Sequence, residues 1–312
     1  MTDHSWTYHM PEFECDPFNE AMMKYSPWSG HRYFGYDFVA NYKPGIIAEL
    51  GSYYGCSSFT FLQAVKDFGL STRFYSIDSW KGDSFTKNDY REDIYGKFME
   101  VLHHCYPDQH AAVLKMTFDE AAERFDDETI DLLHIDGSHN YQDVKHDFET
   151  WAGKVKKNGV IFLHDISDDE LFGREMGSHI FWEELRERYP YTFSFPFSYG
   201  LGVLFREETA YAAFLQNIDA DRYQKLANTA DNINKDNLRR NYFRIRDLES
   251  YISELKNTID KYKRNVQGKD QYIAELQDTI GKYEATVQGK DGYIVKLQNL
   301  LKSCEAELAG RN

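Results

Sequence analysis

The sequence predicts an α/β protein whose N-terminal part forms a doubly wound, mostly parallel sheet and whose C-terminal part forms a long coiled coil. Two patterns support this prediction. Within residues 1–206, short apolar runs alternate with stretches of helical spacing, which is typical of parallel strands joined by helices. Within residues 238–312, apolar residues recur at every seventh position, which is typical of helices that supercoil around one another.

The predicted sheet begins with four apolar, β-rich runs, which are accompanied by four helical stretches. The expected strands are 46–50, 74–77, 130–135 and 160–163, and the expected helices are 57–68, 121–125, 141–156 and 178–189. Two further β-rich runs, 192–197 and 202–205, are joined by Ser198-Tyr199-Gly200-Leu201. This pair predicts an antiparallel hairpin that closes one edge of the sheet.

The composition suits a folded protein with unlike parts. The chain has 312 residues, of which 42% are hydrophobic and 16% aromatic, so it can build a core. The chain has 36 basic and 51 acidic residues, and the resulting net charge of -15 argues against a nucleic-acid partner. We expect four segments: an aromatic-rich N-terminal cap (1–45), the α/β domain (46–206), a helical linker (207–237) and the coiled coil (238–312).

The lack of a recognisable targeting signal and the spacing of the cysteines predict a cytoplasmic protein. No apolar run approaches the roughly 20 residues of a membrane-spanning helix, and residues 1–9 are too polar for a signal peptide. We therefore expect a cytoplasmic location, or a peripheral one at the inner membrane through a partner. The four cysteines form neither a C-x-x-C pair nor a zinc spacing, which predicts reduced thiols: Cys15, Cys56, Cys105 and Cys304.

The C-terminal segment contains a 21-residue repeat, which is three heptads long. Tyr251-Ile-Ser-Glu-Leu recurs as Tyr272-Ile-Ala-Glu-Leu and as Tyr293-Ile-Val-Lys-Leu, and every seventh residue from Leu238 to Leu308 is Leu, Ile or Val. Such a seam needs a second helix to bury it, so we expect a homo-oligomer, whereas a solvated single helix is the alternative. Ile or Val at this position favours a dimer, while Tyr and Lys at the second seam position weaken its preference over a trimer.

The first expected strand ends in a glycine turn, Glu49-Leu50-Gly51-Ser52-Tyr53-Tyr54-Gly55. Gly51 permits a tight turn and close approach of a ligand to the backbone. Tyr53 stands where the pyrophosphate of a dinucleotide requires glycine, so the turn disfavours NAD. Asp78, at the end of the second strand, is placed to bind ribose hydroxyls. The pattern suits S-adenosylmethionine.

Several motifs in residues 26–206 together resemble the class I S-adenosylmethionine-dependent methyltransferases, in the branch found beside or fused to bacterial surface-polysaccharide glycosyltransferases. Besides the glycine turn, the motifs are Ser26-Pro-Trp-Ser-Gly-His-Arg-Tyr-Phe, Ile77-Asp-Ser-Trp-Lys-Gly-Asp, Leu133-His-Ile-Asp-Gly-Ser-His-Asn-Tyr, His164-Asp165, and Phe181-Trp-Glu-Glu-Leu leading to Tyr199-Gly-Leu-Gly. The resemblance implies a Rossmann-like methyltransferase sheet and a role in polysaccharide biosynthesis, such as that of O-antigen. It also implies a set of cofactor-binding residues: Glu49, Gly51, Ser52, Gly55, Asp78, Asp136 and, near the adenine, Phe118.

The expected strands 130–135 and 160–163 end in Ile135-Asp136-Gly137-Ser138-His139 and in His164-Asp165, which places two carboxylates and two imidazoles at one rim of the sheet. Oxygen ligands suit Mg²⁺. In the metal-dependent sugar and macrolide O-methyltransferases that this segment resembles, acids at the positions of Asp136 and Asp165 hold the ion and a histidine at the position of His139 is the base. His164 replaces one expected acid, so it is either a nitrogen ligand suited to Mn²⁺ or Fe²⁺ or a residue that supports the ligands. The alternative is that Asp136 and His139 only cap the following helix.

These residues predict methyl transfer to a hydroxyl. His139 can accept the hydroxyl proton at neutral pH, and a cation near Asp136 would favour its loss, so both are the expected catalytic residues. We expect an O-methyltransferase that acts on a sugar of a surface glycan or its precursor, with a glycosyltransferase as partner. A catalytically inactive scaffold that recruits glycan-assembly enzymes and a small-molecule O-methyltransferase are the alternatives. Three tryptophans either stack on a sugar or belong to the core: Trp28, Trp80 and Trp182.

Overall fold

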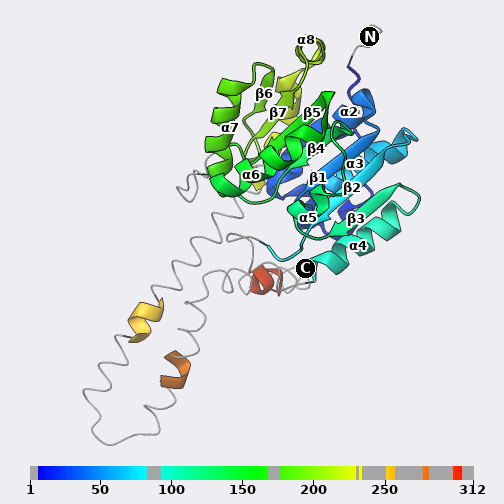
Figure 1. Ribbon diagram of the computed structural model, residues 1–312. Helices are drawn as coiled ribbons and strands as arrows, with labels where there is room; N and C mark the ends of the chain where they lie inside the picture. The colour runs from blue at the N-terminus through cyan, green and yellow to red at the C-terminus, as the bar shows by residue number, and fades with distance from the viewer. Residues whose placement is uncertain are drawn as a thin grey trace, which may run out of the picture. The chain divides into compact units, whose positions relative to one another are not determined.

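The computed structural model describes residues 6–82, 93–167, 176–229, 232–233, 251–256, 277–280 and 298–303 (Figure 1). The chain divides into two compact units. Met1–Ser84 and Asp93–Asn234 make up the first unit, which contains the sheet, and Phe85–Glu92 and Lys235–Asn312 make up the second.

The first unit is built on a seven-stranded sheet with the order β3-β2-β1-β4-β5-β7-β6. Its strands are β1 (Ile46–Leu50), β2 (Arg73–Asp78), β3 (Ala111–Lys115), β4 (Ile130–Ile135), β5 (Val155–His164), β6 (Thr192–Phe195) and β7 (Leu201–Phe205). Strands β1 to β5 are parallel, whereas β7 pairs antiparallel with both β5 and β6. The predicted doubly wound sheet with an antiparallel edge hairpin is therefore confirmed.

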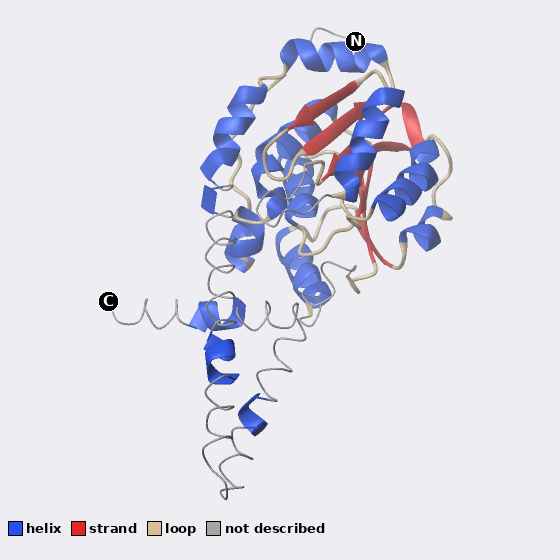
Figure 2. Cartoon of the chain, turned by 90° about the vertical axis from the view of Figure 1, so that its left-hand side faces the viewer, coloured by secondary structure: helices blue, strands red, loops and turns tan. Residues whose placement is uncertain are grey.

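Helices cover both faces of this sheet (Figure 2). They are α1 (Glu20–Lys24), α2 (Arg32–Tyr42), α3 (Cys56–Asp67), α4 (Ile94–Cys105), α5 (Phe118–Ala122), α6 (Tyr141–Trp151), α7 (Gly177–Arg188) and α8 (Glu208–Asn217), with short 3-10 turns η1 (Asp16–Phe18), η2 (Pro27–His31) and η4 (Ala152–Lys154). Helix α2 packs against α3, and α6 packs against both α5 and α7. The helix expected over 141–156 ends at Trp151, because β5 already begins at Val155.

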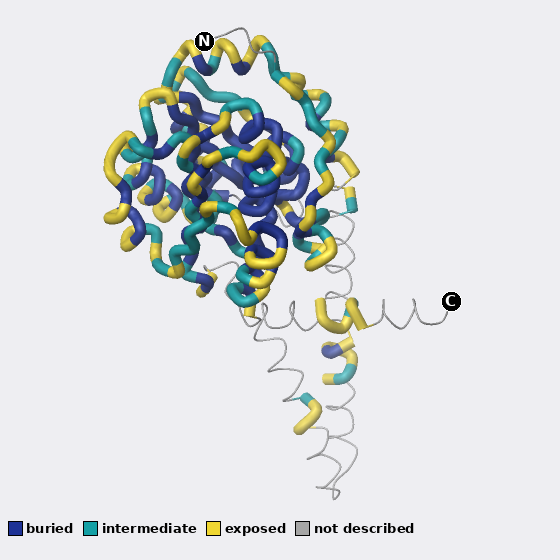
Figure 3. Tube along the Cα trace, turned by 90° about the vertical axis from the view of Figure 1, so that its right-hand side faces the viewer, coloured by how far each residue is buried: buried dark blue, intermediate teal, exposed yellow. Residues whose placement is uncertain are grey.

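One face of the sheet forms an apolar core with α5, α6 and α7. The alternation of side chains along a strand sends Leu133 and Ile135 of β4 to this face. The main members of this core are Leu50, Leu133, Ile135, Leu163, Ala121, Phe148, Trp151, Phe181 and Leu185, all of them buried. The strands and the helix faces turned toward them are the most deeply buried part of the unit (Figure 3).

The opposite face of the sheet contains polar side chains among aromatic ones. Glu49 of β1 and His134 of β4 are directly paired in the parallel register and are fully buried. The rings of Trp28, Phe61 and Phe162 surround His134, with ring centroids 5.5 to 6.4 Å away. A buried acid and imidazole in an aromatic environment require hydrogen-bond partners, so this face points to the site.

The aromatic N-terminal segment lies on this second face. Phe34 and Phe38 of α2 contact Phe162 of β5, with ring centroids 5.5 and 4.7 Å apart. The carboxylate of Asp37, also in α2, accepts hydrogen bonds from Tyr223 and from the backbone of His9. Residues 6–42 therefore form a layer of the domain. The segment after the last strand, in which residues 208–217 and 220–229 are helical, contacts this layer through the hydrogen bond of Tyr223 to Asp37.

The predicted coiled coil lies largely outside the described residues. Three short pieces of it, 251–256, 277–280 and 298–303, are helical. The heptad seam and the oligomer it would form stay predictions. Among the described helices, none is both long and apolar enough to cross a membrane.

Candidate active site

The turn after β1 is in backbone contact with the turn after β4. Gly51 has a φ of +91°, and a Cβ at this position would lie 2.1 Å from the carbonyl oxygen of Asp136. The Gly51 N–H donates to the Ile77 carbonyl at 2.9 Å, and the Asp136 N–H donates to the Leu50 carbonyl at 2.8 Å. Only glycine fits this position. Because Gly51 has no side chain, the backbone of Asp136 can lie against the glycine turn.

Other residues of the predicted cofactor set lie around this turn. Gly55 has a φ of +93° and donates its N–H to the Ser52 carbonyl at 2.7 Å, which closes the turn directly before α3. Phe118 is half-buried at the start of α5, where Thr117 and Glu120 form a capping box. The capping box fixes the direction of the chain at Phe118, so the ring is held at the end of β3.

Asp78 anchors the glycine turn. Its carboxylate accepts three backbone hydrogen bonds, from Ser52 (3.1 Å), Tyr53 (3.0 Å) and Trp80 (2.6 Å). Burial raises the pKa of this carboxyl above its usual value, although the three N–H donors counteract that shift. The sequence predicted a ribose contact for Asp78. The structure adds a second role, the anchoring of the glycine turn through backbone hydrogen bonds, which residue spacing did not indicate.

Replacing Asp78 by Ala is expected to weaken cofactor binding by roughly 1 to 3 kcal/mol and to lower the free energy of unfolding as well, because three N–H groups lose their acceptor. Calorimetry and denaturant titration measure the two effects. Asp78→Asn, which keeps one acceptor oxygen, should lie between wild type and Asp78→Ala in both. Unchanged stability in the Ala variant would contradict the anchoring role and leave only a ligand contact.

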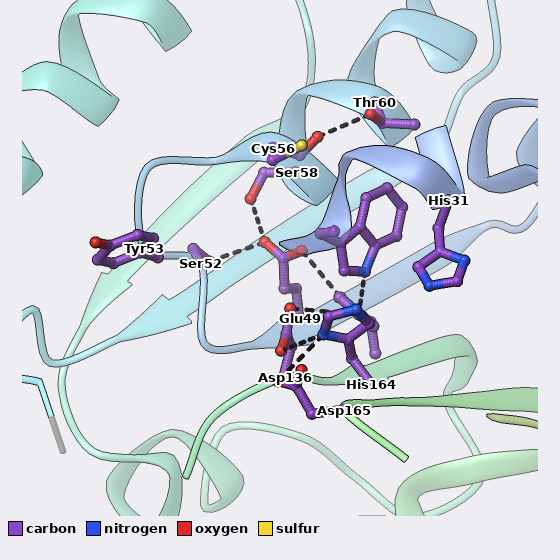
Figure 4. A network of polar contacts seen from close by, with 12 residues as sticks. His31, Glu49, Ser52, Tyr53, Cys56, Ser58, Thr60, Asp136, His164 and Asp165 are labelled. Carbon is purple, nitrogen blue, oxygen red and sulfur yellow. Dashed lines mark hydrogen bonds and ion pairs between the residues drawn. The ribbon is translucent and has the colours of Figure 1, made fainter. Parts of the chain in front are cut away.

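Glu49 lies beneath the turn in a network of buried polar contacts (Figure 4). One of its oxygens accepts hydrogen bonds from the hydroxyls of Ser52, at 2.9 Å, and Ser58. The other lies 3.1 Å from Nδ1 of His134. Because the Trp28 indole donates to Nε2 of His134 at 3.0 Å, the proton of that imidazole belongs on Nδ1, where it is donated to Glu49.

This network changes the interpretation of Glu49. The sequence predicted that Glu49 contacts the cofactor, but its side chain is completely enclosed and both oxygens are occupied. Glu49 therefore holds Ser52 and the start of α3 in place from below. Any effect of Glu49 on a ligand would therefore pass through the turn and not through direct contact.

Asp136, His164 and Asp165 converge beyond the ends of β4 and β5. Nδ1 of His164 lies 3.1 Å from a carboxylate oxygen of Asp136 and 3.3 Å from one of Asp165. Nε2 of His164 donates to the carbonyl of Ser198 at 3.0 Å. Burial lowers the pKa of His164, but the two carboxylates outweigh burial and raise it well above its usual value. His164 is therefore an imidazolium held between two acids.

His139 is paired with Asp165. Its Nε2 lies 2.7 Å from Oδ2 of Asp165, and its side chain is partly exposed. Burial raises the pKa of Asp165, but the imidazoles of His164 and His139 outweigh burial and hold it well below the usual range. Asp165 is thus ionised and favours a proton on Nε2 of His139, and in that tautomer Nδ1 is the unprotonated nitrogen.

The contacts of Asp136 and His139 with the end of β5 argue against the alternative that they only cap α6. Helix α6 has Asn140 at its N-cap, without a side-chain cap hydrogen bond. The nearby donors, the hydroxyl of Ser138 and the amide of Asn140, both bind Asp143 instead. Asp136 and His139 face the end of β5, so they belong to the rim cluster.

The donor set fits a divalent cation. Asp136, His164 and Asp165 each offer one ligand atom, and these atoms lie within 4.8 Å of one another. Two oxygens and one nitrogen around a common centre suit Mg²⁺ or Mn²⁺ with water completing the coordination shell. Binding would require Nδ1 of His164 to give up its proton, because a metal and a proton compete for the same lone pair.

The three tryptophans prove to be part of the core. Trp28 and Trp182 are 4% and 1% exposed, and Nε1 of Trp182 donates to the hydroxyl of Ser194 at 2.9 Å. Trp80 is 7% exposed and donates to the carbonyl of Tyr53 at 3.0 Å. None of these rings presents a free face of the kind that stacking on a sugar requires.

Two buried residues of the site were not singled out from the sequence. His31 of η2 shares the Ser198 carbonyl with His164, at 3.2 Å, and burial lowers its pKa, so it is neutral. Asp147 of α6 is 7% exposed, and no hydrogen bond or ion pair to its carboxylate occurs among the described residues. The sequence pattern that could have identified Asp147 is an acidic residue on the apolar side of α6, one helical turn after Asp143.

Burial raises the pKa of Asp147 to about 7, with Asp143 and Asp119 adding to the shift and His146 opposing it. The unfolded carboxyl titrates near 3.9, so the folded state is penalised at high pH and this penalty disappears as the pH falls toward 4. Asp147→Asn is expected to raise the free energy of unfolding by about 2 to 4 kcal/mol at pH 8 and by less than half of that at pH 5. Denaturant titrations at both pH values, with exposed Glu149→Gln as control, measure this; equal effects at the two would refute it.

Known proteins are similar to this chain over its α/β part. Residues 48–166 match the model of a family described as a methyltransferase domain. All the predicted site residues, from Glu49 to Asp165, lie inside the matched segment. The uncharacterized protein y4gI of Sinorhizobium fredii is 38% identical over 181 residues, which is 58% of this chain and 19% of that protein. The chain thus spans about a fifth of the length of this curated relative.

Solved structures of methyltransferases are similar at low identity. The SAH-bound methyltransferase PaMTH1 of Podospora anserina has 12% identity and a TM-score of 0.48, over 66% of this chain and 91% of that chain. A methyltransferase of Geobacter sulfurreducens has 21% identity and a TM-score of 0.45, over 63% of this chain and 90% of that chain. Both scores are below 0.5, so these structures carry no argument, and the finding that remains is the match of residues 48–166 to the family described as a methyltransferase domain.

Proposed function

We propose that this protein is an S-adenosylmethionine-dependent O-methyltransferase that methylates a sugar hydroxyl of a surface glycan or its precursor. The observation that supports it most is the pairing of Asp165 with His139 next to a glycine turn within the matched domain. This arrangement provides a proton acceptor where the methyl group would be transferred. The sugar as acceptor is supported by the resemblance of the 26–34 and 181–202 motifs to the polysaccharide branch of the family.

His139 is the proposed base. Asp165 orients its imidazole and would stabilise the imidazolium that forms when a hydroxyl proton moves to Nδ1. The hydroxyl oxygen then attacks the methyl group of the sulfonium, the bond between methyl carbon and sulfur breaks, and the electron pair stays on sulfur. The sulfonium is already an activated donor, so positioning of the acceptor and removal of its proton are the protein's main contributions.

A divalent cation is proposed at Asp136, His164 and Asp165. When bound, such an ion would lower the pKa of an acceptor hydroxyl and orient it. The Asp165–His139 pair offers a second mechanism, because a carboxylate–imidazole pair can deprotonate a hydroxyl without a metal. The two mechanisms share His139 and differ in their dependence on the ion.

Removing divalent cations is expected to lower turnover by at least about 10²-fold if the cation assists the reaction. The measurement compares methyl transfer in excess chelator with transfer after Mg²⁺, Mn²⁺ or Fe²⁺ is restored. Asp136→Asn should weaken the response to added cation, while exposed Asp126→Asn, outside the site, should respond as wild type does. Full activity in chelator would favour the metal-independent mechanism.

The acceptor class has its own experiment. Purified protein is incubated with labelled S-adenosylmethionine and an extracted pool of lipid-linked glycans, and the products are weighed by mass spectrometry. A mass increase of one methyl group on a glycan is the expected result. Labelling of small hydroxylated compounds instead would favour the small-molecule methyltransferase, and no transfer despite cofactor binding would favour the scaffold.

The C-terminal repeats have a proposed role in assembly. A parallel homo-oligomeric coiled coil over 238–312, as a dimer in preference to a trimer, would space the methyltransferase domains from a glycosyltransferase partner. Each 21-residue unit would add about 31 Å at 1.5 Å per residue. The three helical pieces within the described residues are compatible with this arrangement.

A further inference from the structure

We propose that Asp147 binds the adenine of S-adenosylmethionine by accepting a hydrogen bond from its 6-amino group. The inference rests on the proposed function, because it requires this cofactor. It places a cofactor contact inside helix α6, of which the sequence motifs include only the first residue, Tyr141. Helix α6 packs against α5, and both lie beside the carboxyl end of β4 (Figure 1).

Three different elements converge at Gly137, the second residue after β4. A Cβ placed on Gly137 would lie 2.6 Å from Cε2 of the Phe118 ring and 3.7 Å from Oδ2 of Asp147. The backbone of Gly137, which carries no side chain, therefore lies close to both an aromatic ring from α5 and a carboxylate from α6. The backbone at Gly137 also adjoins Gly51 in the turn after β1, since a Cβ on Gly51 would lie 2.9 Å from the Cα of Gly137. The group is thus contiguous with the glycine turn.

The carboxylate of Asp147 has acceptor capacity that the described residues do not use. No hydrogen bond to it occurs among them, and the nearby donors are engaged elsewhere: Ser138 and Asn140 bind Asp143, and His146 binds Asp119. Neither of its oxygens is among the fully enclosed, unpartnered polar atoms of the described residues. A buried acceptor that keeps an opening favours a ligand that brings its own hydrogen-bond donor.

The chemistry at this position selects one end of the cofactor. The sulfonium must lie near His139 and Asp165, where the acceptor hydroxyl is activated. The opposite end of the cofactor is a flat purine with an amino donor at its edge. An aromatic ring and a carboxylate acceptor suit that group, because the ring contacts the base and the acceptor pairs with the amino hydrogens. Burial raises the pKa of Asp147, and a donor bound to its carboxylate would counteract that shift by stabilising the ionised form.

The test compares two ligands by calorimetry on the full chain. One is S-adenosylhomocysteine, and the other is its analogue in which hydrogen replaces the 6-amino group. Wild type is expected to bind the analogue roughly 10-fold more weakly. Asp147→Ala should lose this preference, binding S-adenosylhomocysteine about 10-fold more weakly and the two ligands alike. Asp147→Asn retains an acceptor oxygen and should recover the preference, and exposed Glu149→Ala on the same helix should behave as wild type.

A full preference for the amino group in both Asp147 variants would overturn the inference. A loss of affinity for both ligands by the same factor in Asp147→Ala, with the preference intact, would show that Asp147 only supports the fold of α6, and would overturn it too. If wild type bound neither ligand, the proposed function would fail, and the inference with it. The failure of the contact and the failure of the function are therefore distinguishable.

Discussion

Replacing His139 by alanine is expected to lower methyl-transfer turnover by about 10² to 10⁴-fold while leaving the affinity for S-adenosylhomocysteine unchanged. The reason is geometric. Nε2 of His139 lies 2.7 Å from Asp165, which favours a proton there, so Nδ1 is the nitrogen proposed to take the hydroxyl proton. Without the imidazole, an acceptor hydroxyl must lose its proton to water. Single-turnover kinetics separates this chemical step from binding.

A matched control is available on the neighbouring helix. His146 of α6 is an exposed histidine whose Nε2 lies 2.8 Å from an aspartate, Asp119, so it imitates the pair without facing the rim. His146→Ala should keep wild-type turnover. If His139→Ala were fully active, His139 would not be the base, and proton removal would have to be assigned to another group of the rim cluster.

The second large effect is expected at Gly51. In Gly51→Ala the new Cβ would lie 2.1 Å from the Asp136 carbonyl oxygen, a contact between two backbones in which no flexible side chain can move aside. The φ of +91° is unfavourable for alanine in addition. We expect a loss of about 3 kcal/mol or more in the free energy of unfolding and no measurable cofactor binding.

Gly69 separates the two causes. Its φ is +55°, yet nothing lies within 4 Å of a Cβ placed there, so Gly69→Ala tests the backbone conformation without a clash. This control should lose only about 1 to 2 kcal/mol and should bind cofactor as wild type does. Equal losses in the two variants would mean that the contact between the turns after β1 and β4 contributes little.

The sequence was sufficient to predict which side chains meet at the carboxyl edge of the sheet. The carboxyl ends of parallel strands meet at one edge of a sheet, so Asp136 after β4 and His164-Asp165 at the end of β5 had to converge. Gly51 was identified for the same reason, as a turn residue directly after a buried strand. These inferences depend only on strand order and polarity, which local patterns determine well.

The pairing of these residues could not be predicted. Spacing does not say whether Asp165 faces His139, His164 or a cation, and in the structure its Oδ2 lies near both imidazoles. That arrangement depends on a φ of +58° at Asp165, which a sequence pattern does not reveal. The three backbone donors to Asp78 were equally hidden, because main-chain groups leave no trace in residue identity.

Element boundaries show a similar limit. Strand β3 (Ala111–Lys115) lies at the edge of the sheet and is only half-buried, so its apolar pattern is weaker than that of the central strands. The start of β5, Val155-Lys-Lys-Asn, is polar, and its first two residues fell within the helix expected over 141–156. Tertiary pairing with Ile130 of β4 makes it a strand, and no local propensity indicates that pairing.

The central claim is that the glycine turn and the rim beside it bind S-adenosylmethionine for methyl transfer. Its most direct test is calorimetric titration of the full chain with S-adenosylhomocysteine, the demethylated product. The expected result is saturable binding of one molecule per chain that is weakened by roughly 1 to 3 kcal/mol in Asp78→Ala. The absence of detectable binding at millimolar ligand to the folded wild-type protein would contradict the claim and would favour a domain that keeps the fold without the activity.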